Sequence, residues 1–286
     1  MRTAIAITIW YIAGAYTVAV GIADDETPPS KAGQRAAKRL EIMRGAIDDF
    51  QITSSEIEDK SLLKFSERPS LRYADQSREA GAGLKGVIDA TLWRLGTTGR
   101  PKAIVTLEIY LADQGNPVLT YEFVSLTPQK FDMKRALGVA HWMPHSTDLS
   151  MSELKEAPAP ANTLKARQSQ MRELARRFTA EEKLGSESIS LRLLAQPIDR
   201  YDDKMAGILD GAVFVFANGT NPEMGLLLEC SEKQWSFGTF RLASAALFAQ
   251  FDGESIDVAA KPKGYPVDAP YTATRHGIFL PDDEEE

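Results

Sequence analysis

Two stretches of the chain repeat apolar residues at helical spacing. One lies within residues 31–50 and the other within residues 163–178. Their apolar positions are Leu40, Met43, Ile47 and Phe50 in the first, and Met171, Leu174, Ala175 and Phe178 in the second. Intervals of three and four residues place apolar side chains on one face of a helix. We therefore expect an amphipathic helix at the start of each half of the chain.

Behind each predicted helix the pattern changes to short apolar runs between turns, which is typical of antiparallel strands. Two of the turns, residues 96–101 and 218–222, each separate two such runs and predict a hairpin. Asn-Gly in the second turn tolerates positive φ. A further strand is expected after each hairpin, at residues 119–126 and 235–242. Prolines recur from Ala259 onward, so no strand is expected there.

The two halves match without gaps around these hairpins. Gly86-Val87-Ile88-Asp89 aligns with Gly207-Ile208-Leu209-Asp210 at an offset of 121 residues (207 minus 86), and Glu108 aligns with Glu229 at the same offset. Leu-Arg occurs in the strand that precedes each hairpin, at Leu71-Arg72 and at Leu191-Arg192. The match indicates an internal duplication.

The predicted fold class is α+β, with two tandem copies of a helix-plus-antiparallel-sheet unit around a pseudo-two-fold axis. Each unit is small and leaves apolar surface uncovered, so we expect the two units to share a core. The predicted organisation is a signal peptide (1–23), a first unit (24–145), an Ala/Pro linker (146–162), a second unit (163–258) and a Pro-containing acidic tail (259–286).

The N-terminus is typical of an exported protein. Arg2 is the only charged residue before Asp24, residues 4–23 are uncharged, and the small residues Gly21 and Ala23 suit a processing site. Twenty uncharged residues can also just span a bilayer, so an uncleaved anchor is the alternative. We expect a periplasmic or secreted protein, attached to a membrane only if residues 4–23 are retained.

Charge and cysteine content narrow the functional classes. The chain of 286 residues has a net charge of -7 and no basic cluster, which excludes nucleic acid as a natural partner. Its single cysteine, Cys230, cannot form an internal disulfide. Cys230 follows a strand-like run, which favours a buried apolar role over that of a nucleophile.

The duplicated acidic residues are the best candidates for chemistry: Asp89, Glu108, Asp210 and Glu229. If each hairpin is symmetric about its turn, each Asp faces its Glu. Opposed like charges destabilise a hairpin and call for a shared proton, a basic partner or a cation. Paired carboxylates also serve hydrolysis. A register shift of one residue would instead put the two acids on opposite faces and leave them structural, which is the simpler reading.

Other chemistry has weak support. His141 and His145 lie four residues apart, but Pro144 between them argues against a helical metal site. The chain has no Gly-x-Ser-x-Gly motif, no phosphate-binding loop and no dinucleotide glycine pattern, so we expect no cofactor. Most aromatic residues of the predicted strands are expected in the core, although a few on one sheet face would suit a sugar or lipid.

Several short motifs resemble a family of uncharacterised exported bacterial proteins. These motifs are Trp142-Met143-Pro144, Gln170-Met171-Arg172, Phe178-Thr179-Ala180, Leu191-Arg192-Leu193-Leu194, Gln196-Pro197, Arg200-Tyr201, Leu209-Asp210-Gly211-Ala212, Gly219-Thr220 and Pro222-Glu223. The resemblance covers roughly residues 142–229 and weakens in the first half. It implies export and this type of fold unit, and it implies no activity.

Three functional classes follow from the sequence. The favoured one is an extracytoplasmic binding or scaffold protein with an unknown ligand or protein partner. The alternatives are a hydrolase that uses a paired Asp/Glu site and a structural component of an envelope assembly. The missing motifs leave enzymatic activity open and favour a protein that is not an enzyme.

Overall fold

The computed structural model describes residues 30–80, 84–112 and 116–280. The predicted signal peptide and the acidic residues 282–286 lie outside these ranges. Both predicted helices are present, as α1 (Lys31–Asp48) and α2 (Leu164–Ala175). The side chains of Ser30 and Thr163 cap them by accepting a backbone N–H of the first turn, which would otherwise lack a partner.

Three antiparallel sheets make up about half of the described chain. A five-stranded sheet has the order β17-β5-β4-β3-β2, a nine-stranded sheet runs β16-β15-β9-β10-β12-β13-β14-β8 with β11 beside β12, and a small sheet has the order β1-β6-β7. The strands of the first are β2 (Leu71–Ala80), β3 (Leu84–Leu95), β4 (Ala103–Ala112), β5 (Pro117–Ser125) and β17 (Tyr271–Gly277). Those of the second are β8 (Ser152–Glu153), β9 (Phe178–Leu184), β10 (Glu187–Leu193), β11 (Asp199–Asp203), β12 (Ile208–Asn218), β13 (Asn221–Cys230), β14 (Trp235–Arg241), β15 (Ala246–Phe251) and β16 (Glu254–Ala259). The small sheet holds β1 (Phe50–Thr53), β6 (Asp132–Arg135) and β7 (His141–Trp142), and two 3₁₀ turns are η1 (Lys60–Leu63) and η2 (Ala136–Gly138).

The expected α+β class with tandem helix-plus-sheet units is wrong. Strands account for 48% of the structure and helices for 15%, so the fold is β-rich. The sheets also exchange strands between the halves of the chain. β17 follows the second half but pairs with β5, and β8 comes from the linker but pairs with β14. Periodicity locates a strand in the sequence, but it does not determine which sheet edge that strand will cover.

The strand β17 also corrects the expectation that the chain forms no strand after Ala259. Pro270 ends the proline-containing segment, and its carbonyl accepts the backbone N–H of Ser125. The next seven residues continue this pairing along β5. The prolines therefore stop just before a strand and do not prevent it.

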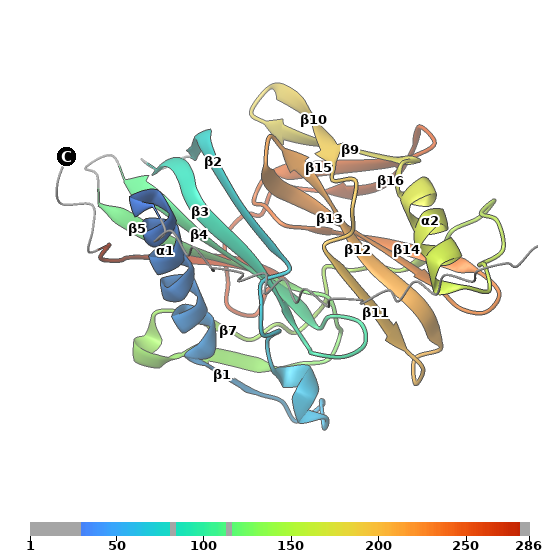
Figure 1. The fold of residues 1–286 in the computed structure, drawn as a ribbon, viewed down its shortest axis with the longest axis horizontal. Helices are drawn as coiled ribbons and strands as arrows, with labels where there is room; N and C mark the ends of the chain where they lie inside the picture. Colours follow the sequence, from blue (N-terminus) through green and yellow to red (C-terminus); the bar gives the residue numbers. More distant parts are fainter. Residues whose placement is uncertain (1–29, 81–83, 113–115, 281–286) are drawn as a thin grey trace, which may run out of the picture.

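The two large sheets pack face to face, with α1 and α2 on their outer sides (Figure 1). A shared core fills the space between the sheets and includes Leu92, Ile104 and Val124 from one sheet and Val213, Val215 and Leu227 from the other. The expected shared core is confirmed. Outside it, Met43 and Ile47 of α1 pack on the five-stranded sheet together with the small sheet, and Met171 and Leu174 of α2 pack on the nine-stranded sheet.

Neither helix within these described ranges is long and apolar enough to cross a bilayer.

Candidate functional site

The acidic residues of each hairpin do not face each other. Asp89 is opposite Ile109 and Glu108 is opposite Ala90, while Asp210 is opposite Cys230 and Glu229 is opposite Gly211. Successive strand residues point to opposite faces, so each Asp lies on the outer, helix-covered face and each Glu on the inner face. The reading in which each Asp faces its Glu is therefore wrong, and the alternative, a register shift of one residue, is what the structure has.

Two different features produce the shift of one residue. The first hairpin pairs Leu95 with Ala103, so its centre is Gly99 and not the Thr98–Gly99 bond. The second hairpin begins in the expected register, with Asn218 opposite Asn221. A β-bulge after Phe216 then displaces the rest of the ladder by one residue.

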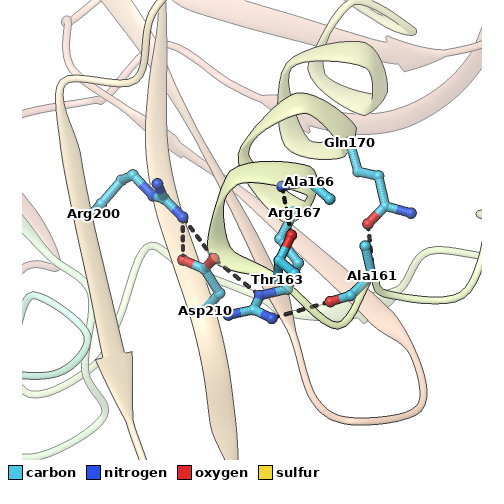
Figure 2. Close-up of polar contacts among 7 residues, drawn as sticks. All are labelled: Ala161, Thr163, Ala166, Arg167, Gln170, Arg200 and Asp210. Atoms are coloured by element: carbon cyan, nitrogen blue, oxygen red, sulfur yellow. Dashed lines mark hydrogen bonds and ion pairs between the residues drawn. The ribbon is translucent and has the colours of Figure 1, made fainter.

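On the nine-stranded sheet, Asp210 is held by two arginines (Figure 2). Arg167 of α2 donates its Nε–H to Oδ2 at 3.1 Å, and Arg200 of β11 donates from Nη2 to both carboxylate oxygens at 2.8 and 2.6 Å. The Asp210 side chain is 4% exposed. The carboxylate therefore joins a helix to two neighbouring strands in a place that water barely reaches.

Asp89 has the matching arrangement on the five-stranded sheet. Arg39 of α1 donates its Nε–H to Oδ2 at 3.0 Å, and Arg72 of β2 binds both oxygens, at 2.8 Å from Nε and 2.6 Å from Nη2. Arg72 also donates to the carbonyl of Ala36 in α1. The hydrogen bond to Asp89 raises the pKa of Arg72 above its ordinary value. Each aspartate thus ties one helix to one sheet.

The two glutamates are bound from the inner face by the tyrosines that follow these strand arginines. Tyr73 donates its hydroxyl to Glu108 at 2.8 Å, and Tyr201 donates to Glu229 at 2.6 Å. Burial, with the neighbouring glutamate, raises the pKa of both tyrosines well above the ordinary value, so both hydroxyls keep their protons. An Arg-Tyr dipeptide in a strand therefore supplies the outer Asp with a cation and the inner Glu with a hydroxyl.

The second oxygen of each glutamate has a different partner in the two sheets. Glu108 accepts the hydroxyl of Tyr110 at 2.8 Å, within its own strand. Arg100 instead binds both oxygens of Glu229, at 2.7 Å from Nε to Oε1 and 2.5 Å from Nη2 to Oε2. Arg100 lies in the turn of the other hairpin, so this ion pair joins the two large sheets.

The sequence interpretation anticipated a basic partner for these acids, but it identified neither the arginines nor the tyrosines. Arg39 and Arg167 are 128 residues apart (167 minus 39), as are Arg72 and Arg200, and as are the helix residues Met43 and Met171. Matching Leu71-Arg72 with Leu191-Arg192 was wrong. Arg192 lies in β10 and donates to the carbonyl of Gly219. The sequence signal for the correct match was the pair of Arg-Tyr dipeptides, Arg72-Tyr73 and Arg200-Tyr201, which are 128 residues apart like the matching helix residues.

The remaining sequence candidates lie apart from this arrangement. His141 places Nε2 3.0 Å from Oδ1 of Asp132, and the backbone of His145 donates to the carbonyl of Asp268. Within residues 30–80, 84–112 and 116–280, no group of three His, Cys, Asp or Glu side chains is placed to hold a metal ion. Cys230 is buried, and burial raises the pKa of its thiol to about 11, which disfavours the reactive thiolate.

Comparisons with protein-family models, with curated proteins and with solved structures find no match to this chain. The resemblance to uncharacterised exported proteins therefore stays a prediction.

Proposed function

We propose that this chain is an extracytoplasmic binding or scaffold protein in which the four duplicated acidic residues hold the fold together. The observation that carries the proposal is that each carboxylate is buried and already bound by arginine or tyrosine side chains. The compartment rests on the sequence of residues 1–23.

The arrangement is unfavourable for the hydrolase alternative. Glycoside hydrolysis, for example, needs two carboxyl groups about 5 to 9.5 Å apart that flank one bond, with one of them able to give up a proton. Here the Asp and Glu of a hairpin are on opposite faces of a sheet. Asp210 already accepts from two guanidinium groups, which occupy both of its carboxylate oxygens.

The recurrence of the same contacts supports an internal duplication as the origin of the two arrangements. An Arg from a helix and an Arg-Tyr dipeptide from a strand meet an Asp and a Glu in both sheets. Chance would have to place five side chains alike in two separate sheets, so duplication is the simpler explanation.

Thermal unfolding of the purified full chain against peptides, sugars, lipids and divalent cations tests the proposed function. A compound that binds the folded state raises the midpoint by mass action. We expect one class to do so, and an equal rise in the Asp89→Asn variant measured from its own midpoint. Hydrolysis of any compound in the panel, abolished in Asp210→Asn, would contradict the proposal.

A further inference from the structure

The Ala-Pro linker lies against α2 and β14 as an extended strap, which we define as residues 157–161. Three side chains donate to its backbone carbonyls. Trp235 Nε1 binds Pro158 at 2.9 Å, Gln170 Nε2 binds Ala159 at 2.9 Å, and Arg167 Nη1 binds Ala161 at 3.0 Å. Gln170 also accepts the backbone N–H of Ala161 at 2.8 Å, as Figure 2 shows.

The surrounding side chains bind the backbone of the strap and not its side chains. Its residues carry only methyl groups and proline rings, which offer no hydrogen-bonding group. Ala157, Pro160 and Ala161 are half-buried, while Pro158 and Ala159 are exposed. Prolines at two of the five positions fix φ near the value of polyproline II. An aromatic donor beside polar side chains is a recurring way in which proteins recognise such chains.

The groove under the strap is held in place by the rest of the fold. Trp235 is 1% exposed and belongs to the core beneath α2. Arg167 is oriented by Asp210, which binds its Nε while Nη1 faces the strap (Figure 2). Asp210 is in turn fixed by Arg200. Arg167 and Trp235, two of the three donors that contact the strap, are therefore oriented by contacts outside it.

We propose that the groove formed by Gln170, Arg167 and Trp235 is a recognition site for an extended Ala/Pro-rich peptide, which the chain's own strap fills and which a partner's segment takes when the strap lifts. The site deepens the proposed function, on which it rests, by naming the chemistry of the partner. The strap itself shows what the groove accepts: carbonyls at three of four consecutive residues, in a segment whose two prolines favour polyproline II.

Because the strap belongs to the same chain as the groove, it competes with any partner peptide. A ligand attached through a short linker acts at an effective concentration of about millimolar, so the intact strap excludes weak competitors. The strap is also at the surface, with Pro158 and Ala159 exposed, and hydrogen bonds from three side chains hold it there, while Ala157 packs against the core beneath α2. Loosening it should therefore open the groove without unfolding the core.

The test uses the full chain, a Pro158→Gly, Pro160→Gly variant, and a synthetic peptide of residues 155–162. The readout is the NMR signal of the Trp235 indole N–H, assigned with Trp235→Phe. We expect this signal to shift in the variant and to return saturably as the peptide is added, with half-saturation near 1 mM or below. The parent should not respond. A peptide with alanine in place of both prolines should bind about tenfold more weakly, because it is not pre-organised.

The indole signals of Trp93 and Trp142, whose donors bond to Thr91 and Ala269, report whether the variant is folded. If they are lost, Pro160→Ala replaces the double variant. Asp89→Asn and Asp210→Asn, each added to the folded strap variant, form a matched pair, since only Asp210 orients a groove residue. We expect Asp210→Asn alone to weaken peptide binding.

Two results would overturn the site while leaving the broader binding role standing. One is a Trp235 signal that ignores the peptide up to about 5 mM in the folded variant. The other is a strap variant that forms a dimer and still ignores the peptide, which would show that the groove takes only the strap of a second copy. Hydrolysis lost in Asp210→Asn would instead contradict the proposed function.

Discussion

At the scale of single residues, the partners of each side chain decide its role. Asp89 and Asp210 carry charge into places that are nearly dry, which is costly unless the charge is paired and hydrogen-bonded. Two arginines meet that need at each aspartate. A sequence can reveal that an acid recurs, but the recurrence alone does not distinguish a catalytic acid from a buried ion pair.

His276 supplies a prediction at this scale. Its ring stacks on Tyr121 in the neighbouring strand β5, and Arg135 of β6, which is bonded to Tyr121 and Asp49, faces it. Burial, followed by the charge of Arg135, lowers the pKa of His276 below its ordinary 6.5. The unfolded chain therefore takes up this proton first as the pH falls through about 6.5, and the folded state loses stability until its own lower pKa is passed.

Denaturant unfolding between pH 5 and 8 measures this effect. We expect His276→Gln to flatten the decline in stability below pH 6.5 that the parent shows. His145→Gln is the control, because His145 is exposed, and it should leave the parental decline intact. Equal curves for the parent and His276→Gln would refute the assignment.

At the scale of elements, the spacing of apolar residues predicted the helices and hairpins correctly, but it did not predict the strand register. Both helices and both hairpins follow from the spacing of apolar residues and from the turn residues. The bulge after Phe216 has no comparable sequence signal, and it moves Asp210 away from Glu229. The strand β17 was missed because its nearest prolines were taken as a barrier.

The two hairpin tips make a second prediction. Gly99 has φ +64° and a side-chain methyl there would lie 2.6 Å from Oδ2 of Asp203. Gly219 has φ +59° and the same methyl would lie 2.8 Å from Oδ2 of Asp75. Each hairpin tip therefore lies in close contact with the other large sheet. Gly99 contacts Asp203, three residues after Arg200, and Gly219 contacts Asp75, three residues after Arg72. Alanine at either tip meets both an unfavourable φ and a close contact.

Gly185 has the unfavourable φ without the close contact, so it separates the two effects. It has φ +63° at the turn between β9 and β10, with nothing within 4 Å of an added methyl. We expect Gly185→Ala to cost about 1 kcal/mol for the left-handed backbone alone. Gly99→Ala and Gly219→Ala should each cost roughly 1 kcal/mol more, because the aspartate must move. Equal losses in all three variants, measured by denaturant unfolding, would show that the tips do not press on the opposite sheet.

At the scale of the whole molecule, polar contacts at the hairpin tips lock the two large sheets around their shared apolar core. Arg94 of β3 binds Asp199 of β11 at 2.7 Å, and Arg100 binds Glu229. From the tip of the second hairpin, the hydroxyl of Thr220 donates to the carbonyl of Ala74 in β2 of the other sheet at 2.5 Å. The shared core was expected from the small size of the halves. The crossing contacts were not, because they join residues more than 100 positions apart.

Arg100→Ala tests this lock. The change removes the guanidinium group from the Glu229 carboxylate, which is 3% exposed and keeps the hydroxyl of Tyr201. We expect a loss of about 2 kcal/mol, below that of a fully buried pair because Arg100 is one-third exposed. Glu229→Gln should remove part of that loss in a double-mutant cycle. The exposed pair Arg44–Asp48 is the control, and Arg44→Ala should cost at most about 0.5 kcal/mol. Additive losses for Arg100 and Glu229 would contradict a coupled pair.

The central claim is that the duplicated acids stabilise the fold and do not catalyse a reaction. Denaturant unfolding of Asp89→Asn and Asp210→Asn beside Asp202→Asn tests it most directly, because Asp202 is exposed and next to Tyr201. We expect losses of about 3 kcal/mol for the first two, each of which leaves a guanidinium pair without its counter-charge. Asp202→Asn should change stability by about 0.5 kcal/mol or less. Variants of Asp89 and Asp210 as stable as the parent, or more stable, would show the pattern of residues kept for activity at the expense of stability, and would contradict the claim.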